Sequence, residues 1–116
     1  MFQQLIVPDD YFYGISKLAS EKLIQEFGRR YNLKYTIVRY GSLYGERAES
    51  ENGIYRIIEE ALSDKKITYS GDGDEIREYI HASDAAKLSV DIIEDTSYAN
   101  DTITLTGVEK LKRRDL

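Results

Sequence analysis

The sequence lacks cysteine and tryptophan altogether, and it has only one histidine and one proline in 116 residues. The absence of cysteine excludes disulfide bridges and thiolate metal sites. Because His81 is the only histidine, a metal site made of several histidines is excluded too. No run approaches the roughly 20 apolar residues that a membrane-spanning helix needs. We therefore expect neither a bound metal nor a membrane partner.

Negative charge outweighs positive charge, with 21 Asp and Glu residues against 16 Lys and Arg residues. The net charge of -5 argues against nucleic acid as a partner, because binding a phosphate backbone requires a basic surface. The only basic cluster comprises Lys110, Lys112, Arg113 and Arg114. We interpret it as the solvated face of a helix, with an anion site as the alternative. The first residues show no basic segment followed by an apolar run, so no secretory signal is expected and the cytoplasm is the predicted location.

The hydrophobic pattern predicts an alternation of helices and strands. Apolar residues recur at spacings of three and four in three segments, which predicts helices over residues 11–31, 53–62 and 84–94. Ser83 is expected to be the N-cap of the third helix. Strands are expected over residues 34–40, 66–70, 76–81 and 102–106, and residues 108–116 are expected to begin a further helix. This order is typical of an α/β fold with a mostly parallel sheet.

Tyr13 and Lys17 are the sharpest chemical feature of the sequence. On a helix, residues four apart share a face, so the phenol and the ammonium lie side by side. A nearby cation favours the phenolate form of a tyrosine. Such a tyrosine can exchange a proton with a substrate hydroxyl near neutral pH. The alternative is that this common spacing carries no chemistry.

Four motifs in order favour the catalytic interpretation. YGISKLASEKL is followed by KYTIVRY, GSLYGER and GDGDEIREYIHASDAAK. Over residues 13–107 the chain resembles the extended short-chain dehydrogenase/reductase family, in particular its NAD-dependent sugar-nucleotide epimerases and dehydratases. The resemblance implies a partial Rossmann-like parallel sheet with helices, NAD or NADP as cofactor of the parent protein, and a nucleotide-diphospho-sugar as its substrate.

The resemblance also implies roles for individual residues near the cofactor. Tyr13 matches the family's general acid/base, and Lys17 matches the lysine that favours its ionisation and hydrogen-bonds the nicotinamide ribose. Tyr40 and Ser42 fall in the segment that passes the nicotinamide and the substrate. Many family members have Asn where this chain has Ser42, which puts a specific contact there in doubt.

For the substrate, the resemblance points to Arg77, which matches an arginine that contacts the diphosphate. A guanidinium suits this role because its planar fork bonds two phosphate oxygens at once. The alternative is a surface ion pair with Glu75 or Glu78. His81 resembles a structural position in the family rather than a catalytic one.

Two family features are absent from the sequence. The G-x-x-G-x-x-G phosphate loop does not occur, and the catalytic Ser or Thr that precedes the family's tyrosine falls outside the chain. Residues 1–116 are therefore expected to be a single fragment: the C-terminal part of the NAD(P)-binding domain interleaved with part of the substrate-binding region. We expect this fragment, without the N-terminal cofactor-binding half, to be inactive alone and to bind no cofactor alone.

Two other functions stay open at this point. One is a non-catalytic, truncated α/β module that acts through self-association, and the other is a related reductase of small carbonyl compounds. A homo-oligomer is expected in any case, because strands 34–40 and 102–106 have unpaired edges and helix 11–31 has a second apolar side.

Overall fold

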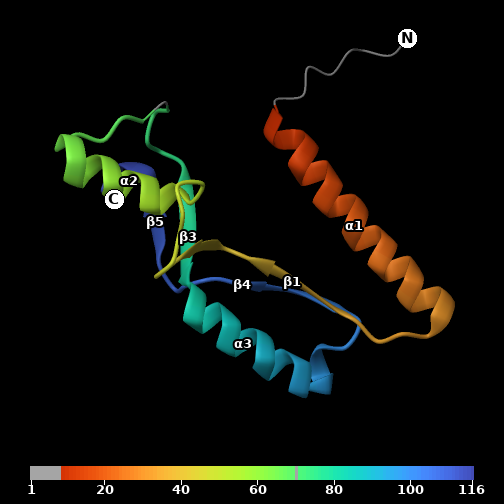
Figure 1. The fold of residues 1–116 in the computed structure, drawn as a ribbon. Coiled ribbons are helices and arrows are strands. Elements are labelled where there is room, and N and C mark those ends of the chain that lie inside the picture. Colours follow the sequence, from red (N-terminus) through yellow and green to blue (C-terminus); the bar gives the residue numbers. More distant parts are fainter. Residues whose placement is uncertain (1–8, 70) are drawn as a thin grey trace, which may run out of the picture.

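The computed structural model describes residues 9–69 and 71–116, which form an open α/β structure (Figure 1). The helices are α1 (Asp9–Tyr31), α2 (Gly53–Asp64) and α3 (Ala82–Glu94), and the strands are β1 (Thr36–Tyr40), β2 (Ser42–Tyr44), β3 (Ile76–His81), β4 (Asp101–Leu105) and β5 (Lys110–Lys112). Short 3₁₀ turns cover Thr96–Tyr98 and Arg113–Asp115. The α/β class predicted from the sequence is confirmed. Among the described residues, no helix has both the length and the apolar character needed to cross a bilayer.

The strands form two small sheets that are joined through backbone hydrogen bonds. β1 pairs in parallel with β4, while β3 pairs in parallel with β2 and antiparallel with β5. Between the sheets, Gly41 N donates to Leu105 O at 2.8 Å, and Gly107 N donates to Tyr79 O at 2.9 Å. A Cβ at Gly41 would lie 2.7 Å from the Glu78 carbonyl oxygen, so only glycine allows this close approach.

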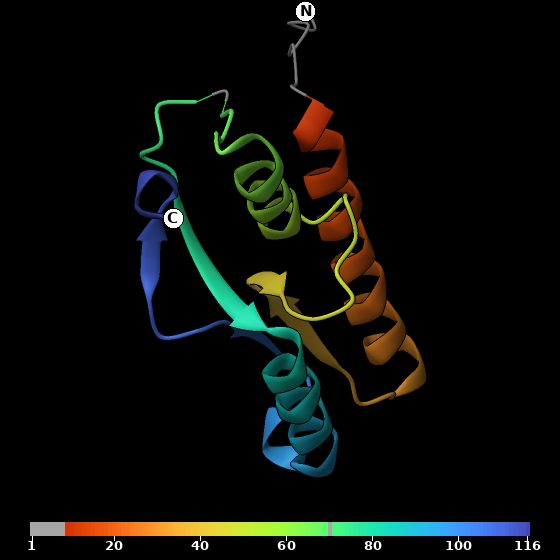
Figure 2. The same cartoon turned by 60° about the vertical axis from the view of Figure 1, so that its left-hand side comes forward.

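The apolar core of the described chain is small. Its buried apolar side chains are Ile37, Ile80, Ala85 and Ile92. They come from β1, β3 and α3, and α3 follows directly from the end of β3 (Figure 2). The core therefore joins α3 to the sheets, and it includes no residue of α1 or α2.

Helix α1 stands apart from α2 and β3 in Figure 1. Nine of its large apolar or aromatic side chains are exposed, Tyr13 and Phe27 among them. Arg39 on β1 holds the helix by donating two hydrogen bonds to the Glu21 carboxylate, at 2.7 Å from Nε and 2.6 Å from Nη2. Both apolar sides of α1 that the sequence pattern indicates are open in this chain.

The caps explain where the two shorter helices begin. Asn52 Oδ1 accepts hydrogen bonds from the N–H groups of Ile54 and Tyr55 at 3.0 and 3.2 Å, which caps α2. For α3 the predicted N-cap was wrong: His81, not Ser83, has this position. The physical reason is that His81 Nδ1 accepts the Ser83 N–H at 3.2 Å, so Ser83 already lies inside the helix.

Two element predictions are corrected by the structure. Residues 66–69 form no strand, and Ser70, the last residue of that predicted strand, lies outside the described residues. No strand of the described residues pairs with this segment, and its Thr68 N–H donates to the Glu60 carboxylate at 3.2 Å instead. Residues 108–116 do not begin a helix. They form β5 and a 3₁₀ turn, because the open edge of β3 offers backbone partners to residues 110–112.

Candidate active site and substrate pocket

Tyr13 and Lys17 lie one turn apart on α1, as their spacing predicts. Lys17 Nζ is 5.2 Å from the centroid of the Tyr13 ring, within the range of a cation–π contact. The helix is regular here, and Ser16 Oγ donates to Tyr13 O at 2.7 Å. The Tyr13 side chain is 69% exposed, so its hydroxyl is open to a molecule that approaches α1.

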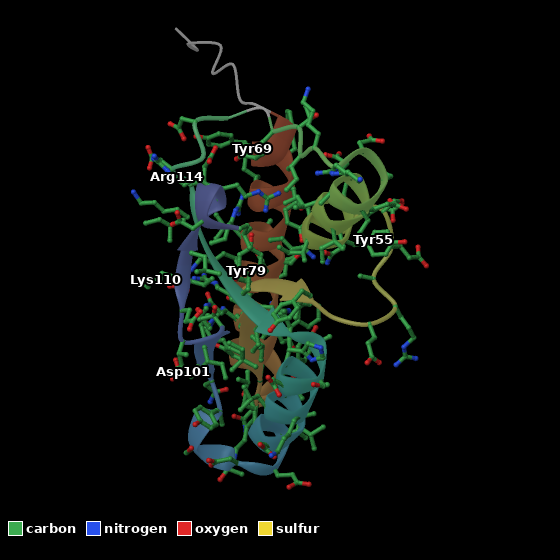
Figure 3. All side chains as sticks on the ribbon, turned by 90° about the vertical axis from the view of Figure 1, so that its left-hand side faces the viewer. Tyr55, Tyr69, Tyr79, Asp101, Lys110 and Arg114 are labelled. Carbon is green, nitrogen blue, oxygen red and sulfur yellow. The ribbon has the colours of Figure 1, made fainter. Side chains whose placement is uncertain are left out.

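A pocket of about 230 Å³ brings Ser42 and Arg77 together. It lies between β2, the start of α2, β3 and the C-terminal 3₁₀ turn, and we call it the Arg77 pocket. Its lining consists of Ser42, Leu43, Asn52, Gly53, Ile54, Tyr69, Arg77, Tyr79 and Arg113. Tyr69 and Tyr79 are labelled in Figure 3, where both are drawn between β5 and α2. The two residues predicted to contact the substrate, Ser42 and Arg77, therefore line the same cavity.

Arg77 has no carboxylate within ion-pair distance among the described residues. Glu78 pairs with Lys110 Nζ at 3.1 Å, and Glu75 makes no ion pair with a described residue. The surface ion pair considered as the alternative role of Arg77 is thus not formed in this structure. Its guanidinium is left available to an anion in the pocket.

The pKa of the Tyr69 phenol depends on the charged groups around this pocket. The hydrogen bond with the Glu75 carboxylate raises the pKa of the Tyr69 phenol above its ordinary value of 10.0, and desolvation adds to this effect. The positive charges of Arg113 and Arg77 act in the opposite direction on the pKa. Two guanidinium groups are therefore close enough to influence the same phenol.

Tyr40 lies at the end of β1, and Ser42 begins β2 directly beyond Gly41. All three residues line a second hollow of about 420 Å³, which also includes Arg77. The Tyr40 hydroxyl lies 2.7 Å from Ser89 Oγ on α3, so it is already engaged within the chain. The structure thus groups Tyr40, Ser42 and Arg77 at one end of the sheets.

The pair on α1 is not part of this group. Tyr13 and Lys17 line neither hollow. Within residues 9–69 and 71–116, no side-chain hydrogen bond joins either of them to Ser42 or Arg77, and only the hydrogen bonds between Arg39 and Glu21 connect side chains of α1 to the sheets.

The pocket residues that sequence reasoning missed include Asn52 and Arg113. Asn52, ahead of a strongly periodic helix, had a recognisable N-cap signal. It also fixes the loop, because its Nδ2 donates to Leu43 O at 2.8 Å. Arg113 had no signal of its own, since it was assigned to a solvated helix face together with its basic neighbours.

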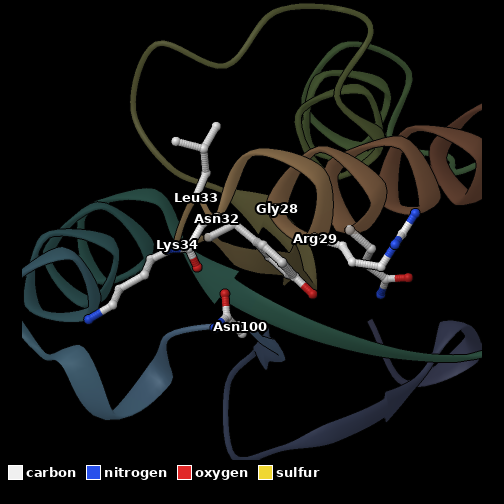
Figure 4. Close-up of a pocket in the computed structure, with 8 residues that line it drawn as sticks. Gly28, Arg29, Asn32, Leu33, Lys34 and Asn100 are labelled. Atoms are coloured by element: carbon white, nitrogen blue, oxygen red, sulfur yellow. The ribbon is translucent and has the colours of Figure 1, made fainter.

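Other parts of the structure offer less for binding. A hollow of about 360 Å³ at the C-terminal end of α1 is shown in Figure 4. Its only arginine, Arg29, is already ion-paired with Glu26 at 2.5 Å. Elsewhere in the described part of the chain, no three carboxylate or imidazole groups gather where they could hold a metal ion.

Comparison with known proteins gives consistent matches. The model of the NAD dependent epimerase/dehydratase family matches residues 5–104. An uncharacterised UDP-glucose epimerase of Bacillus subtilis is 28% identical over 98 residues, which are 84% of this chain and 31% of that protein. A putative UDP-glucose 4-epimerase of Methanocaldococcus jannaschii is 35% identical over 81 residues, 67% of this chain and 27% of that protein.

Solved structures agree with these matches. The UDP-glucose 4-epimerase of Thermotoga maritima, solved with UDP-glucose, superposes with a TM-score of 0.80 at 27% identity, over 89% of this chain and 34% of that one. The UDP-glucuronic acid 4-epimerase of Bacillus cereus, solved with UDP-glucuronic acid and NAD, gives 0.82 at 28% identity, over 89% and 33%. The chain spans about a third of the length of such relatives, in line with a partial Rossmann-like sheet. By sequence and by fold, it belongs to the NAD dependent epimerase/dehydratase family.

Proposed function

We propose that this chain supplies the proton-transfer pair and the diphosphate-binding pocket of an epimerase or dehydratase that acts on a nucleotide-diphospho-sugar. The observation that carries this proposal is the grouping of Ser42 and Arg77 in one pocket, in a chain whose family and fold are those of such enzymes. Arg77 makes no ion pair with any residue that the structure describes. Relatives that were solved with UDP-glucose or UDP-glucuronic acid support this class of substrate.

Tyr13 moves the proton in the proposed reaction. Its phenolate takes the proton of a sugar hydroxyl, which prepares that carbon for oxidation, and the phenol returns a proton when the resulting carbonyl is reduced. Lys17, beside the Tyr13 ring, offsets the negative charge that the phenolate carries. Both side chains can reach a substrate because α1 leaves them exposed.

The residues of this chain fit the nicotinamide end of NAD or NADP. Lys17 has three N–H donors, and its ammonium is engaged with no carboxylate among the described residues, so it can hydrogen-bond a ribose. We assign Tyr13, Lys17, Tyr40 and Ser42 to this contact. When bound, the cofactor accepts and returns a hydride at the sugar carbon. The chain's sequence has no G-x-x-G-x-x-G loop for the cofactor's pyrophosphate.

Ser42 and Arg77 bind the diphosphate part of the substrate. The guanidinium pairs with the diphosphate, which fixes the position of the sugar relative to the pair on α1. We propose the cytoplasm as the location, since a cysteine-free chain is compatible with a reducing compartment.

Turnover by a completed enzyme tests the proposal. The chain replaces the matching segment of the Thermotoga maritima relative, so that the remainder of that enzyme completes it, and conversion of UDP-glucose is assayed with NAD. We expect turnover that depends on Tyr13. Its absence in a folded hybrid would favour a non-catalytic module that acts through self-association, which the small core of this chain also fits. Turnover of small carbonyl compounds alone would favour the reductase.

A further inference from the structure

Arg113 differs from the rest of the basic C-terminal cluster. The other three members each pair with a carboxylate: Lys110 with Glu78, and Lys112 and Arg114 with Asp74. In the part of the chain that the structure describes, Arg113 makes no ion pair of this kind. Its charge is therefore not neutralised locally, although it belongs to the same short segment.

Arg113 turns toward the Arg77 pocket and is half-buried there. Its Nη1 donates to the Tyr79 hydroxyl at 3.0 Å, and its guanidinium carbon lies 5.4 Å from the centroid of the Tyr69 ring. A hydrogen bond and a cation–π contact together hold the guanidinium in one orientation. Among the described residues, only one of its five N–H donors makes a hydrogen bond, which leaves the other donors to a ligand.

The start of α2 adds to the positive character of the same pocket. Gly53, the first helical residue, lies beside Arg113, because a Cβ at Gly53 would be 3.5 Å from Arg113 Nη2. A helix N-terminus carries partial positive charge and favours anions. The pocket thus combines two guanidinium groups from different elements with a helix start.

We propose that Arg113 is a second diphosphate-binding residue, which acts together with Arg77 in the Arg77 pocket. This inference rests on the proposed function, because the diphosphate is that of the nucleotide-sugar. A diphosphate carries charge on both phosphoryl groups, and two planar forks can each bond the oxygens of one group. Tyr79 is the positioning residue that orients the Arg113 fork.

Three uridine ligands that carry two, one or no phosphate groups show how much each phosphate contributes to binding by this chain. UDP, UMP and uridine are titrated into the chain by calorimetry, at two salt concentrations. We expect Arg113→Gln to weaken UDP binding about tenfold or more, as the loss of a charged hydrogen bond predicts, while uridine binding stays unchanged. Arg113→Lys should keep part of the affinity, and Tyr79→Phe should lose less than Arg113→Gln. Arg29→Gln, which removes a paired arginine from another surface, serves as the control.

Other binding results would contradict either the role of Arg113 or the proposed function. Loss of UDP affinity in Arg77→Gln but not in Arg113→Gln overturns the inference and leaves the proposed function intact. An equal loss of uridine and UDP binding in Arg113→Gln assigns the residue a purely structural role. No effect of either substitution, or no UDP binding by the wild-type chain at millimolar concentration, overturns the diphosphate pocket and with it the proposed function.

Discussion

Tyr13 is the residue on which the proposed chemistry depends most directly. In the completed enzyme, Tyr13→Phe removes the ionisable hydroxyl but keeps the ring, so we expect kcat to fall by about 10²–10⁴. Lys17→Met should also lower kcat, because it removes the positive charge beside the Tyr13 ring. Steady-state kinetics measure both effects. Tyr31→Phe, which removes another exposed hydroxyl from α1, is the matched control, and near-normal turnover of Tyr13→Phe would exclude the assigned role.

The sequence predicted some of these residues and not others for physical reasons. The spacing of Tyr13 and Lys17 places them on one helix face whatever surrounds the helix. Arg113 could not be recognised in this way, since its position depends on residues 110–112 pairing with β3. That pairing is a contact between distant segments, and local pattern carries little information about it.

At the scale of elements, the attachment of α1 to β1 should depend on pH. The hydrogen bonds from Arg39 lower the pKa of Glu21 below its ordinary value of 4.5. A group whose pKa is lowered in the folded state stabilises that state above its unfolded pKa, and the effect is lost as the pH falls through the folded pKa. We therefore expect α1 to be held fully at neutral pH and to loosen as the pH drops below about 4.5.

Hydrogen exchange of α1 amides between pH 3 and pH 7 measures this loosening, after correction for the intrinsic exchange rates. At neutral pH, the α1 amides of Glu21→Gln should exchange as fast as those of the unsubstituted chain do at acidic pH, after the same correction. Glu26→Gln is the control, because Glu26 pairs with Arg29 inside α1 and makes no link to the sheets. If both variants behaved alike, the pair between Glu21 and Arg39 would have no special part in holding the helix.

Most elements were predictable because their patterns are local. The three helices and the strands near residues 36–40, 76–81 and 101–105 follow from periodicity and β-branched composition. Residues 66–69 were predicted wrongly, since a strand needs a partner and none of the strands that the structure describes pairs with that segment. The short β2 was missed for the converse reason, as its parallel pairing with β3 makes a strand of three residues in a glycine-containing segment.

At the scale of the whole molecule, we expect the chain to self-associate. Its radius of gyration is 17.9 Å, whereas a compact domain of this length has roughly 13 Å, so the shape is open. The exposed side chains of α1 include Leu23 and Phe27, which line an apolar hollow beside Tyr35. Exposed apolar patches of this kind commonly bind other protein surfaces. Light scattering at micromolar concentration should give a dimer or a larger species.

Substitution of the apolar residues on α1 tests which surface is involved. Leu23→Glu together with Phe27→Glu should shift the scattering mass toward the monomer. Ile93→Glu, at an exposed position on α3, is the control with the same added charge. A sharp monomer peak for the unsubstituted chain would contradict this prediction.

The cofactor prediction also concerns the whole molecule. We expect the isolated chain to bind NAD weakly or not at all, because a glycine-rich loop and a helix N-terminus normally hold the pyrophosphate. Calorimetry with NAD measures this directly. The control is the hybrid that carries the N-terminal segment of a relative, for which binding should be restored. Micromolar affinity for the chain alone would show that other residues hold the cofactor.

The small core has a calorimetric consequence. Unfolding raises the heat capacity in proportion to the apolar surface that becomes newly hydrated, typically by about 12–15 cal/mol/K per residue. A monomer whose described core consists of four buried side chains has little such surface left to expose. Its heat-capacity increment should therefore fall well below the usual value, and its thermal transition should be broad. As concentration rises and copies cover each other's α1, scanning calorimetry should record a larger increment and a sharper transition.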